Sequence, residues 1–479
     1  MNRKAILVTL GMALLLAGCS IGPKYTKPNV PVAPAYGEQP PASFKEANGW
    51  QTAQPSDAVL RGKWWEVFED QQLNALEEQV GQANQTLKVS EANFRQARAQ
   101  IRYQRAALYP TVGAQPGISS NRVSANNPTG VQGYQYGVFS LPVSASWDID
   151  FWGRIRRTIA NAREQFQASA ADLENVKLQL ESDVAVDYFE AHSLDAQKQL
   201  LDQNVAAYQK AFQLTENRFE GGVSAKAEVE QARTQLDQTQ AQDVDVDASR
   251  AQYDHAIAVL IGKNPEEFKL AVLPLRRTPP SIPIGLPSQL LQRRPDIAAA
   301  ERQVAAANEQ IGIAQAAFWP DLVITATGGL QAGSIVNLFT LPSRFWTVGP
   351  QLAQTIFDGG RRRAEVLITR ANYDATAANY RQTALVAFRE VEDNLSTLRI
   401  LEHESAIQHE ATVAAERSVE LSINRYKGGL ITYLDVITAQ TIALTNERTE
   451  VDLLRRRMDA SVSLIKALGG GWDTGRLPA

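Results

Sequence analysis

Two long stretches of the chain carry apolar residues at helical spacing and contain neither proline nor glycine. They run from Arg154 to Phe219 and from Arg361 to Tyr426. Apolar side chains recur about every 3.5 residues in the first stretch, the spacing of a helix packed along its length against neighbours. At about 1.5 Å per residue, each helix would be on the order of 100 Å long. Helices of this length predict an elongated protein rather than a single globular core.

Paired glycines end each long stretch. They are Gly221-Gly222 after the first and Gly428-Gly429 after the second. Glycine readily adopts the left-handed conformation that terminates a helix, so each pair predicts a tight tip followed by a returning helix. The remaining helices are predicted over about 71–108, 224–261, 295–318 and 432–468.

Between the helices, the pattern changes to strict alternation. Residues 139–150 place Phe, Leu, Val, Ala, Trp and Ile on one side and Ser, Pro and Asp on the other, and 346–356 alternate similarly. With glycine-bearing strand candidates upstream of each, the pattern predicts one β-hairpin at about 111–150 and one at about 321–358. Such two-sided strands are typical of a transmembrane β-barrel, although a half-buried sheet in a soluble protein alternates in the same way.

The chain also repeats itself. Arg218-Phe219-Glu220-Gly221-Gly222 is matched by Arg425-Tyr426-Lys427-Gly428-Gly429, 207 positions later, and the upstream strand starts are offset by 210. The sequence therefore predicts two repeats, 61–262 and 290–470, joined by a Pro-rich linker over 263–289 and followed by a tail over 471–479.

Four strands per chain cannot close a barrel. An open sheet edge in lipid would leave backbone groups unpaired at a cost of several kcal/mol each. Two copies would supply eight strands and a filled interior, whereas three would supply twelve strands and a lumen. The strand pattern therefore excludes a monomeric barrel and leaves the choice between two and three copies open.

The N-terminus has the features of an export signal. A basic start and a short apolar stretch are followed by Leu16-Ala17-Gly18-Cys19, which resembles a bacterial lipobox. We expect a signal peptide over 1–18 and, from the resemblance, an S-diacylglycerol and N-palmitoyl lipid on Cys19. Ser20 favours sorting to the outer membrane. A Pro-rich segment over 19–60 should run extended along the folded body.

Composition excludes several classes of function. The formal net charge is −4, which favours no nucleic-acid partner, and one cysteine permits no internal disulfide. The four histidines stand singly, without metal-ligand spacing, and no phosphate-binding loop or nucleophile motif is present. The sequence thus indicates neither catalytic residues, a metal nor a dissociable cofactor, and we expect a passive conduit rather than an enzyme.

Several motifs resemble those of TolC-type outer-membrane factors, and in particular their lipidated OprM/NodT-like branch. The resemblance rests on Leu290–Ile297 (LLQRRPDI), Phe318-Trp319-Pro320, Leu434-Asp435-Val436 and the two glycine tips, and it runs from Cys19 to about Leu468. It implies a mixed α/β membrane protein, in which a long antiparallel α-helical barrel continues a transmembrane β-barrel with four strands per chain and twelve in a homotrimer.

The resemblance also implies a role and partners. The role is the outer-membrane exit duct of a tripartite efflux pump that exports small molecules such as drugs and extends into the periplasm. The partners would be a periplasmic adaptor, an inner-membrane RND-type transporter and outer-membrane lipid. Two alternatives remain: an exit duct for type I protein secretion, and a structural coiled-coil lipoprotein without a pore.

The resemblance also implies functions for the two tips. Adaptor contacts would involve Arg218, Phe219, Gly221, Gly222, Gly428 and Gly429, and a periplasmic gate would involve Glu228, Arg425, Tyr426 and Asp435. Asp435 also has a purely structural interpretation, because Thr432 to Asp435 is a capping-box pattern, and Glu228 is a first-turn acid favoured by the helix dipole.

Arginines follow each apolar strand. They are Arg154, Arg156, Arg157, Arg361, Arg362 and Arg363. Cations at the start of a helix oppose its dipole, so we expect these side chains to contact lipid phosphates or carboxylates at the membrane interface.

Overall fold

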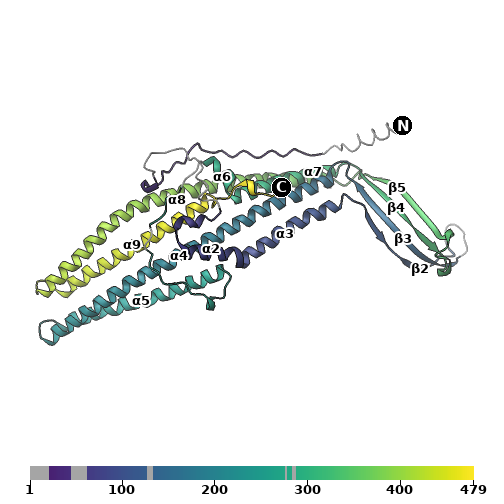
Figure 1. Cartoon of the computed structure of the whole chain (residues 1–479). Helices are drawn as coiled ribbons and strands as arrows, with labels where there is room; N and C mark the ends of the chain where they lie inside the picture. Colours follow the sequence, from purple (N-terminus) through teal and green to yellow (C-terminus); the bar gives the residue numbers. More distant parts are fainter. Residues whose placement is uncertain (1–20, 45–61, 127–132, 276–277, 283–286, 479) are drawn as a thin grey trace. The chain divides into compact units, whose positions relative to one another are not determined.

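The structure is a computed structural model that describes residues 21–44, 62–126, 133–275, 278–282 and 287–478 (Figure 1). The signal peptide and Cys19 lie outside these residues. The α-helices are α2 (Gln71–Ala83), α3 (Gln85–Ala106), α4 (Arg154–Glu220), α5 (Lys226–Leu260), α6 (Pro287–Arg293), α7 (Pro295–Ala316), α8 (Arg361–Lys427) and α9 (Tyr433–Ala467). The strands are β1 (Thr111–Ala114), β2 (Gly117–Arg122), β3 (Gln135–Ile149), β4 (Asp321–Ala332) and β5 (Arg344–Ala353).

The described residues form two compact units. Unit 1 takes its residues from 21–29, 93–169 and 299–380 and contains all five strands, and unit 2 takes the rest. The two long helices contribute to both units.

The long helices are uninterrupted, as the absence of glycine and proline predicts. The α4 and α8 helices span 67 residues each, and the returning helices α5 and α9 span 35 each. No helix in the described part of the chain is both apolar enough and long enough to cross a bilayer.

The helix predicted over 71–108 is divided in two, which corrects the sequence-based prediction. At Asn84 the backbone leaves helical geometry, with ψ of 128°. The Asn84 side chain accepts a hydrogen bond from the backbone N–H of Leu87 (2.9 Å) and donates to the carbonyl of Leu260 (2.7 Å). Asn84 therefore caps α3 and ties the junction to the end of α5.

The sheet has five strands instead of the predicted four, because the first predicted strand is interrupted. The β1 and β2 strands both pair with β3, and they keep one register: Thr111 lies opposite Ser146 and Gly117 opposite Ser140. The gap between them contains Pro116, which has no N–H to donate to the ladder. The two segments thus occupy one position in a sheet of order β1/β2-β3-β4-β5.

Strand pairing collects the apolar residues on one face of this sheet. Directly opposed residues share a face. The larger residues on this face are Val112, Ile118, Phe139, Leu141, Val143, Ala145, Trp147, Ile149, Leu322, Ile324, Ala326, Leu330, Trp346, Val348, Pro350 and Leu352, with Arg344 at the loop end. Several are exposed, including Trp346 (79%), Val348 (62%) and Leu352 (69%). The opposite face is mainly Ser, Thr, Gly and Gln.

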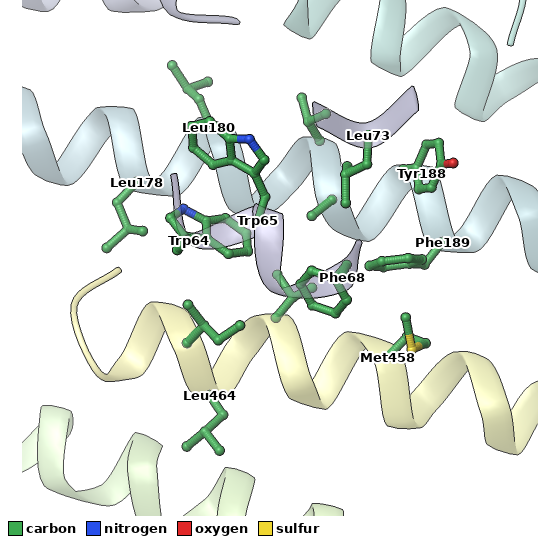
Figure 2. Close-up of a cluster of buried hydrophobic side chains, with 14 of the residues drawn as sticks. Trp64, Trp65, Phe68, Leu73, Leu178, Leu180, Tyr188, Phe189, Met458 and Leu464 are labelled. Atoms are coloured by element: carbon green, nitrogen blue, oxygen red, sulfur yellow. The ribbon is translucent and has the colours of Figure 1, made fainter. Parts of the chain in front are cut away.

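The main apolar core lies in unit 2, where the 3₁₀ helix η3 (Trp64–Phe68) inserts its aromatic side chains among α2, α4 and α9 (Figure 2). Trp64 and Trp65 are 1% and 4% exposed, and the Phe68 ring lies 5.0 Å from that of Phe189 between centroids. The two tryptophans are therefore packing residues of this core.

The described N-terminal segment, 21–41, contains no helix, as its prolines predict. Within unit 2, carboxylates of α8 bind the backbone of this segment and of the short turn that follows it. Glu392 accepts hydrogen bonds from Gly37 N (2.7 Å) and Glu38 N (2.8 Å), and Glu402 accepts them from Ala42 N (2.9 Å) and Ser43 N (3.3 Å). These contacts satisfy backbone donors that have no secondary-structure partner.

One buried carboxyl in the core makes stability depend on pH. Burial raises the pKa of Glu181 to about 7, against the opposing effects of Lys177 and of the Trp64 Nε1–H, which donates to Glu181 at 3.1 Å. The folded state therefore holds a proton that the unfolded state releases near pH 4.5, and stability falls as pH rises from there to about 7.

We expect Glu181→Gln to raise the melting temperature at pH 8 and to change it little at pH 4.5. One pKa unit corresponds to about 1.4 kcal/mol, which sets the gain at pH 8 at up to about 3 kcal/mol. Thermal unfolding followed by circular dichroism measures this, with the exposed Glu78 as the matched control for a Glu→Gln change. A gain of equal size at both pH values would contradict the assignment.

Candidate functional site

The two helical tips end in the same hydrogen-bond pattern. In tip 1 (residues 218–224), Gly222 N donates to Phe219 O (2.9 Å) and Val223 N donates to Arg218 O (2.8 Å). In tip 2 (residues 425–431), Gly429 N donates to Tyr426 O (2.9 Å) and Leu430 N donates to Arg425 O (3.0 Å). Both patterns are Schellman motifs.

The second glycine of each pair supplies the left-handed residue that the motif needs. Gly222 has φ of 71° and Gly429 has φ of 72°, whereas Gly221 and Gly428 do not have positive φ. The paired glycines in the sequence thus serve different purposes, and only the second of each pair is required by backbone conformation.

Tip 1 and tip 2 are in direct contact through Arg218. Its guanidinium lies over the Tyr426 ring at 4.7 Å from the centroid, and its Nη1 donates to the Tyr426 carbonyl at 3.4 Å. The Tyr426 ring is only 4% exposed and lies 5.3 Å from that of Tyr433 between centroids. A cation over an aromatic face is attractive, so Arg218 ties the two hairpins together within the chain.

Two of the predicted gate residues meet here. The Tyr426 hydroxyl donates to the Glu228 carboxylate at 3.4 Å, a long hydrogen bond, and Glu228 is half-buried. Ala232 and Val436 pack with Tyr426 and Tyr433 in a small apolar cluster behind them. Glu228 is therefore a partner of Tyr426 as well as a first-turn acid of α5.

Asp435 makes the contacts of a helix cap within the chain. Its carboxylate accepts from Thr432 N (2.9 Å) and from the Thr432 hydroxyl (2.8 Å). Both Asp435 and Arg425 are exposed. The capping interpretation of Asp435 is thus supported by contacts in one chain, and a gate role for Asp435 and Arg425 stays a prediction about neighbouring chains.

The arginines after the strands are mostly neutralised by aspartates that cap the same helices. Asp150 accepts from Ile155 N (2.9 Å) and Arg156 N (2.8 Å) and pairs with the Arg156 side chain (3.1 Å). Asp358 likewise accepts from Gly360 N (3.1 Å) and pairs with Arg362 (2.7 Å).

Arg154 forms an ion pair with Asp148, and its guanidinium lies 3.8 Å from Asp321. The expected conflict between these cations and the helix dipole is removed by the carboxylates of Asp150 and Asp358 at the two helix starts.

Arg157 does not have the surroundings that were predicted for it at the membrane interface. The residue is only 8% exposed, and its side chain pairs with Glu309 at 2.8 Å and donates to the Pro23 carbonyl at 3.4 Å. This burial does not fit the predicted contact with lipid headgroups. Arg361 and Arg363 are exposed.

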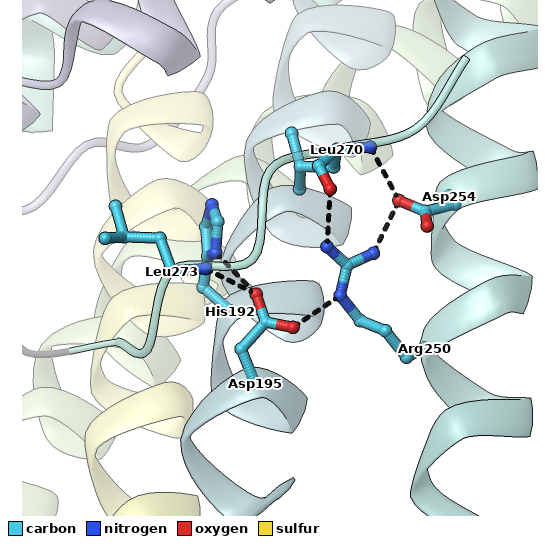
Figure 3. A network of polar contacts seen from close by, with 6 residues as sticks. All are labelled: His192, Asp195, Arg250, Asp254, Leu270 and Leu273. Carbon is cyan, nitrogen blue, oxygen red and sulfur yellow. Dashed lines mark hydrogen bonds and ion pairs between the residues drawn. The ribbon is translucent and has the colours of Figure 1, made fainter. Parts of the chain in front are cut away.

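A buried polar network in unit 2 was missed at the sequence level (Figure 3). Asp195 bonds to His192 Nδ1 (3.0 Å), accepts from Arg250 Nε (2.8 Å) and accepts from Leu273 N (2.9 Å). Arg250 also pairs with Asp254, whose carboxylate accepts from Leu270 N at 3.1 Å. The network fastens the Pro-rich linker to α4 and α5.

The charge state of this network is fixed by its contacts. Burial alone would raise the pKa of Asp195, but hydrogen bonds from His192, Arg250 and Leu273 N outweigh burial and hold the pKa below its ordinary value. His192 is therefore a structural partner of a carboxylate and not an isolated histidine. The only signals in the sequence were the close spacings of His192 to Asp195 and of Arg250 to Asp254.

The described residues contain no cluster of three or more His, Cys, Asp or Glu side chains arranged to hold a metal ion. The arrangement offers extended helices, an exposed apolar sheet face and two linked tips. These are features of a channel or scaffold.

Comparison with known proteins agrees with this description. The family model for outer membrane efflux proteins matches residues 76–263 and 286–470, most of the chain. The chain therefore belongs to the outer membrane efflux protein family, and the resemblance to TolC-type factors is confirmed. It is an outer-membrane efflux channel protein.

Relatives match over nearly their whole length. The solvent efflux pump outer membrane protein SrpC of Pseudomonas putida is 32% identical, covering 96% of this chain and 97% of its own. The cation efflux system protein CusC of Escherichia coli is 29% identical, covering 96% of this chain and 98% of its own. The solved outer-membrane channel OprN is 27% identical with a TM-score of 0.85, covering 95% of this chain and all of its own.

We expect Gly429→Ala to loosen tip 2 and Gly428→Ala to leave it intact. A Cβ on Gly429 would have no atom within 4 Å. The destabilisation therefore comes from placing alanine in the left-handed backbone conformation, which costs about 1 kcal/mol. Amide hydrogen exchange of residues 423–432 measures the local opening, which should accelerate about fivefold for Gly429→Ala. Equal exchange in the two variants would show that the φ requirement does not hold tip 2 together.

Proposed function

We propose that the chain assembles as a homotrimer and forms the exit duct of a tripartite efflux pump. Each copy would contribute two structurally repeated halves. Their strands would form one third of a twelve-stranded transmembrane barrel, and their helices one third of an α-helical tunnel that extends into the periplasm. The duct would be passive, with energy supplied by an inner-membrane transporter.

The observation that carries this proposal is the two-sided sheet with open edges. Its apolar face includes large exposed side chains, while β5 pairs only with β4, and β1 and β2 pair only with β3 among the described strands. Exposed apolar side chains are stable against hydrocarbon, but unpaired edge groups are not, at several kcal/mol each. Strands from other copies would remove both edges.

Three copies are consistent with the polar face of the sheet turning toward the inside of the barrel. Two copies would give a barrel of eight strand positions, whose interior is filled by side chains. Three give twelve and leave a lumen, which the Ser, Thr, Gly and Gln side chains of the opposite face would line with polar groups. An efflux duct requires a water-filled path, so the family assignment also favours three.

The remaining functional regions follow from this arrangement. We propose that Cys19 carries the S-diacylglycerol and N-palmitoyl anchor and that Arg154, Arg156, Arg361, Arg362 and Arg363 lie at the inner membrane interface. The tips would meet a periplasmic adaptor, which in turn joins an RND-type transporter. Support comes from the shared hydrogen-bond pattern of the tips and from their direct contact through Arg218.

Small molecules are the proposed cargo. SrpC is named for solvents and CusC for cations, so proteins of similar length and sequence belong to pumps with different substrates. We therefore assign substrate choice to the transporter and propose that this chain supplies a common outlet.

Native mass spectrometry of the detergent-extracted protein tests the assembly. We expect a trimer that resists dissociation at moderate temperature, because separation would expose two sheet edges per copy. In planar bilayers the same sample should conduct ions. A monodisperse monomer or dimer would refute the twelve-stranded barrel.

The gate assignment predicts a change in conductance. Replacing Tyr426 and Asp435 by Ala together should increase single-channel conductance severalfold, because the Tyr426 contacts to Arg218 and Glu228 and any Asp435 contacts between copies would be lost. Thr432→Ala is the matched control, since it removes a partner of the Asp435 cap but keeps both gate side chains. If the control opens the channel as much as the double variant, Asp435 acts through capping alone.

A further inference from the structure

An open apolar groove lies in unit 1 where the described chain begins. Its volume is about 570 Å³, within the range of small-molecule sites. Its lining consists of Ile21, Gln315, Phe318, Trp319, Arg363, Val366 and Leu367. Phe318, Trp319 and Leu367 are 38%, 47% and 64% exposed, so a large part of this apolar surface is uncovered.

The chain is held firmly at this groove. Gly22 has φ of 120°, and a Cβ placed on it would lie 2.6 Å from the Cα of Gly312. The backbone of the N-terminal segment therefore touches α7 at a point where neither residue has room for a side chain. The Pro23 carbonyl accepts from Asn308 Nδ2 (3.3 Å) and Arg157 Nη2 (3.4 Å). These contacts fix the direction in which the chain reaches Ile21.

The groove is also rigid on its aromatic side. The Trp319 ring stacks on Trp152 with centroids 4.6 Å apart, and Trp152 Nε1 donates to the Pro320 carbonyl at 2.9 Å. Ile21 N donates to the Trp152 carbonyl at 3.3 Å, which joins the N-terminal segment to the same stack. The Arg362 guanidinium lies over the Phe318 ring at 5.2 Å. The groove is thus preformed, and filling it needs little rearrangement.

We propose that this groove holds an acyl chain of the lipid attached to Cys19. The inference rests on the proposed lipidation and goes beyond it by giving the anchor a binding site on its own protein. Cys19 precedes Ile21 by two residues, a reach of at most about 7 Å of extended chain. The occupant is covalently delivered to an apolar surface that is exposed in the single chain, so its effective concentration is far above that of free lipid.

The polar residues of the groove suit this occupant. Gln315 and Arg363 line it together with five apolar residues. Both carry N–H donors, and the ester and amide carbonyls of an acylated cysteine are acceptors. The hydrocarbon would lie on Phe318, Trp319, Val366 and Leu367. Such seating would set the position of the anchor beside β4, which begins at Asp321.

A photo-crosslinking experiment on the full-length trimer tests this site. The photoreactive residue p-benzoylphenylalanine replaces Leu367 in one variant and Ile368 in the other. Ile368 is 61% exposed, close to the exposure of Leu367, but does not line the groove. After irradiation and trypsin digestion, the acylated peptide 19–24 should be joined to peptide 364–370 at least tenfold more in the Leu367 variant.

Each outcome decides the proposal. The proposal would be overturned if the photoreactive residue at position 367 cross-linked to a free phospholipid or to a peptide of another copy. It would also be overturned if position 367 cross-linked to peptide 19–24 no more than position 368 does. The proposal would also be overturned if the mass of peptide 19–24 showed that Cys19 is unmodified. Trimer formation is measured separately, so this result is distinguishable from failure of the channel proposal. Should the Leu367 variant not assemble, a diazirine-bearing fatty acid incorporated at Cys19 of the unaltered chain must cross-link to peptide 364–370.

Discussion

The whole structure depends on one constraint, which is that the backbone N–H and C=O groups of a sheet with an exposed apolar face need hydrogen-bond partners. Four strand positions place the apolar residues of both hairpins on one face, although the two hairpins are far apart in sequence. An apolar face of this kind favours hydrocarbon, and hydrocarbon offers no partners for the N–H and C=O groups of the outer strands. In hydrocarbon, the two edges of this sheet would therefore need strands from other copies, which is the basis of the proposed assembly. The proposed lumen needs three copies rather than two, and the proposed tunnel and exit duct build on that assembly.

A second theme is the use of carboxylates on the long helices to hold extended segments. Glu392 and Glu402 on α8 bind the backbone of the N-terminal region, and Asp195 on α4 binds that of the linker at Leu273. A Pro-rich segment cannot satisfy its own donors through regular structure, and a buried donor without a partner is costly. These carboxylates thus explain how segments without secondary structure stay ordered against the helices. Arg250 and His192 keep Asp195 charged for this purpose.

The sequence predicted a helix, tip or strand well wherever a single local property of the sequence determines it. The absence of glycine and proline gave the extent of α4 and α8, the glycine pairs gave the tips, and strict alternation gave the faces of β3 and β5. The break at Asn84, the burial of Arg157 and the Asp195 network could not be predicted, because each depends on a partner distant in sequence: Leu260, Glu309 and Arg250. Pro116 is evident in the sequence, but its interruption of the first strand is seen only when β3 is known to pair with both β1 and β2. For the site, Tyr426 and Glu228 were predicted together, whereas the contact of Arg218 with the Tyr426 ring was not.

The most direct test of the account compares two adjacent residues of β5. Val348 lies on the apolar face and Thr347 on the polar face, and both are exposed in a single chain. The chain has only one cysteine, Cys19, and the proposed S-diacylglycerol would block its thiol, so single substitutions to Cys at 347 and 348 would supply the reactive thiols. In outer membranes, we predict that Thr347→Cys reacts with a small water-soluble maleimide while Val348→Cys is protected from it and reacts with a lipid-soluble one. Equal reaction of both positions with the water-soluble reagent would contradict a lipid-facing sheet and, with it, the channel.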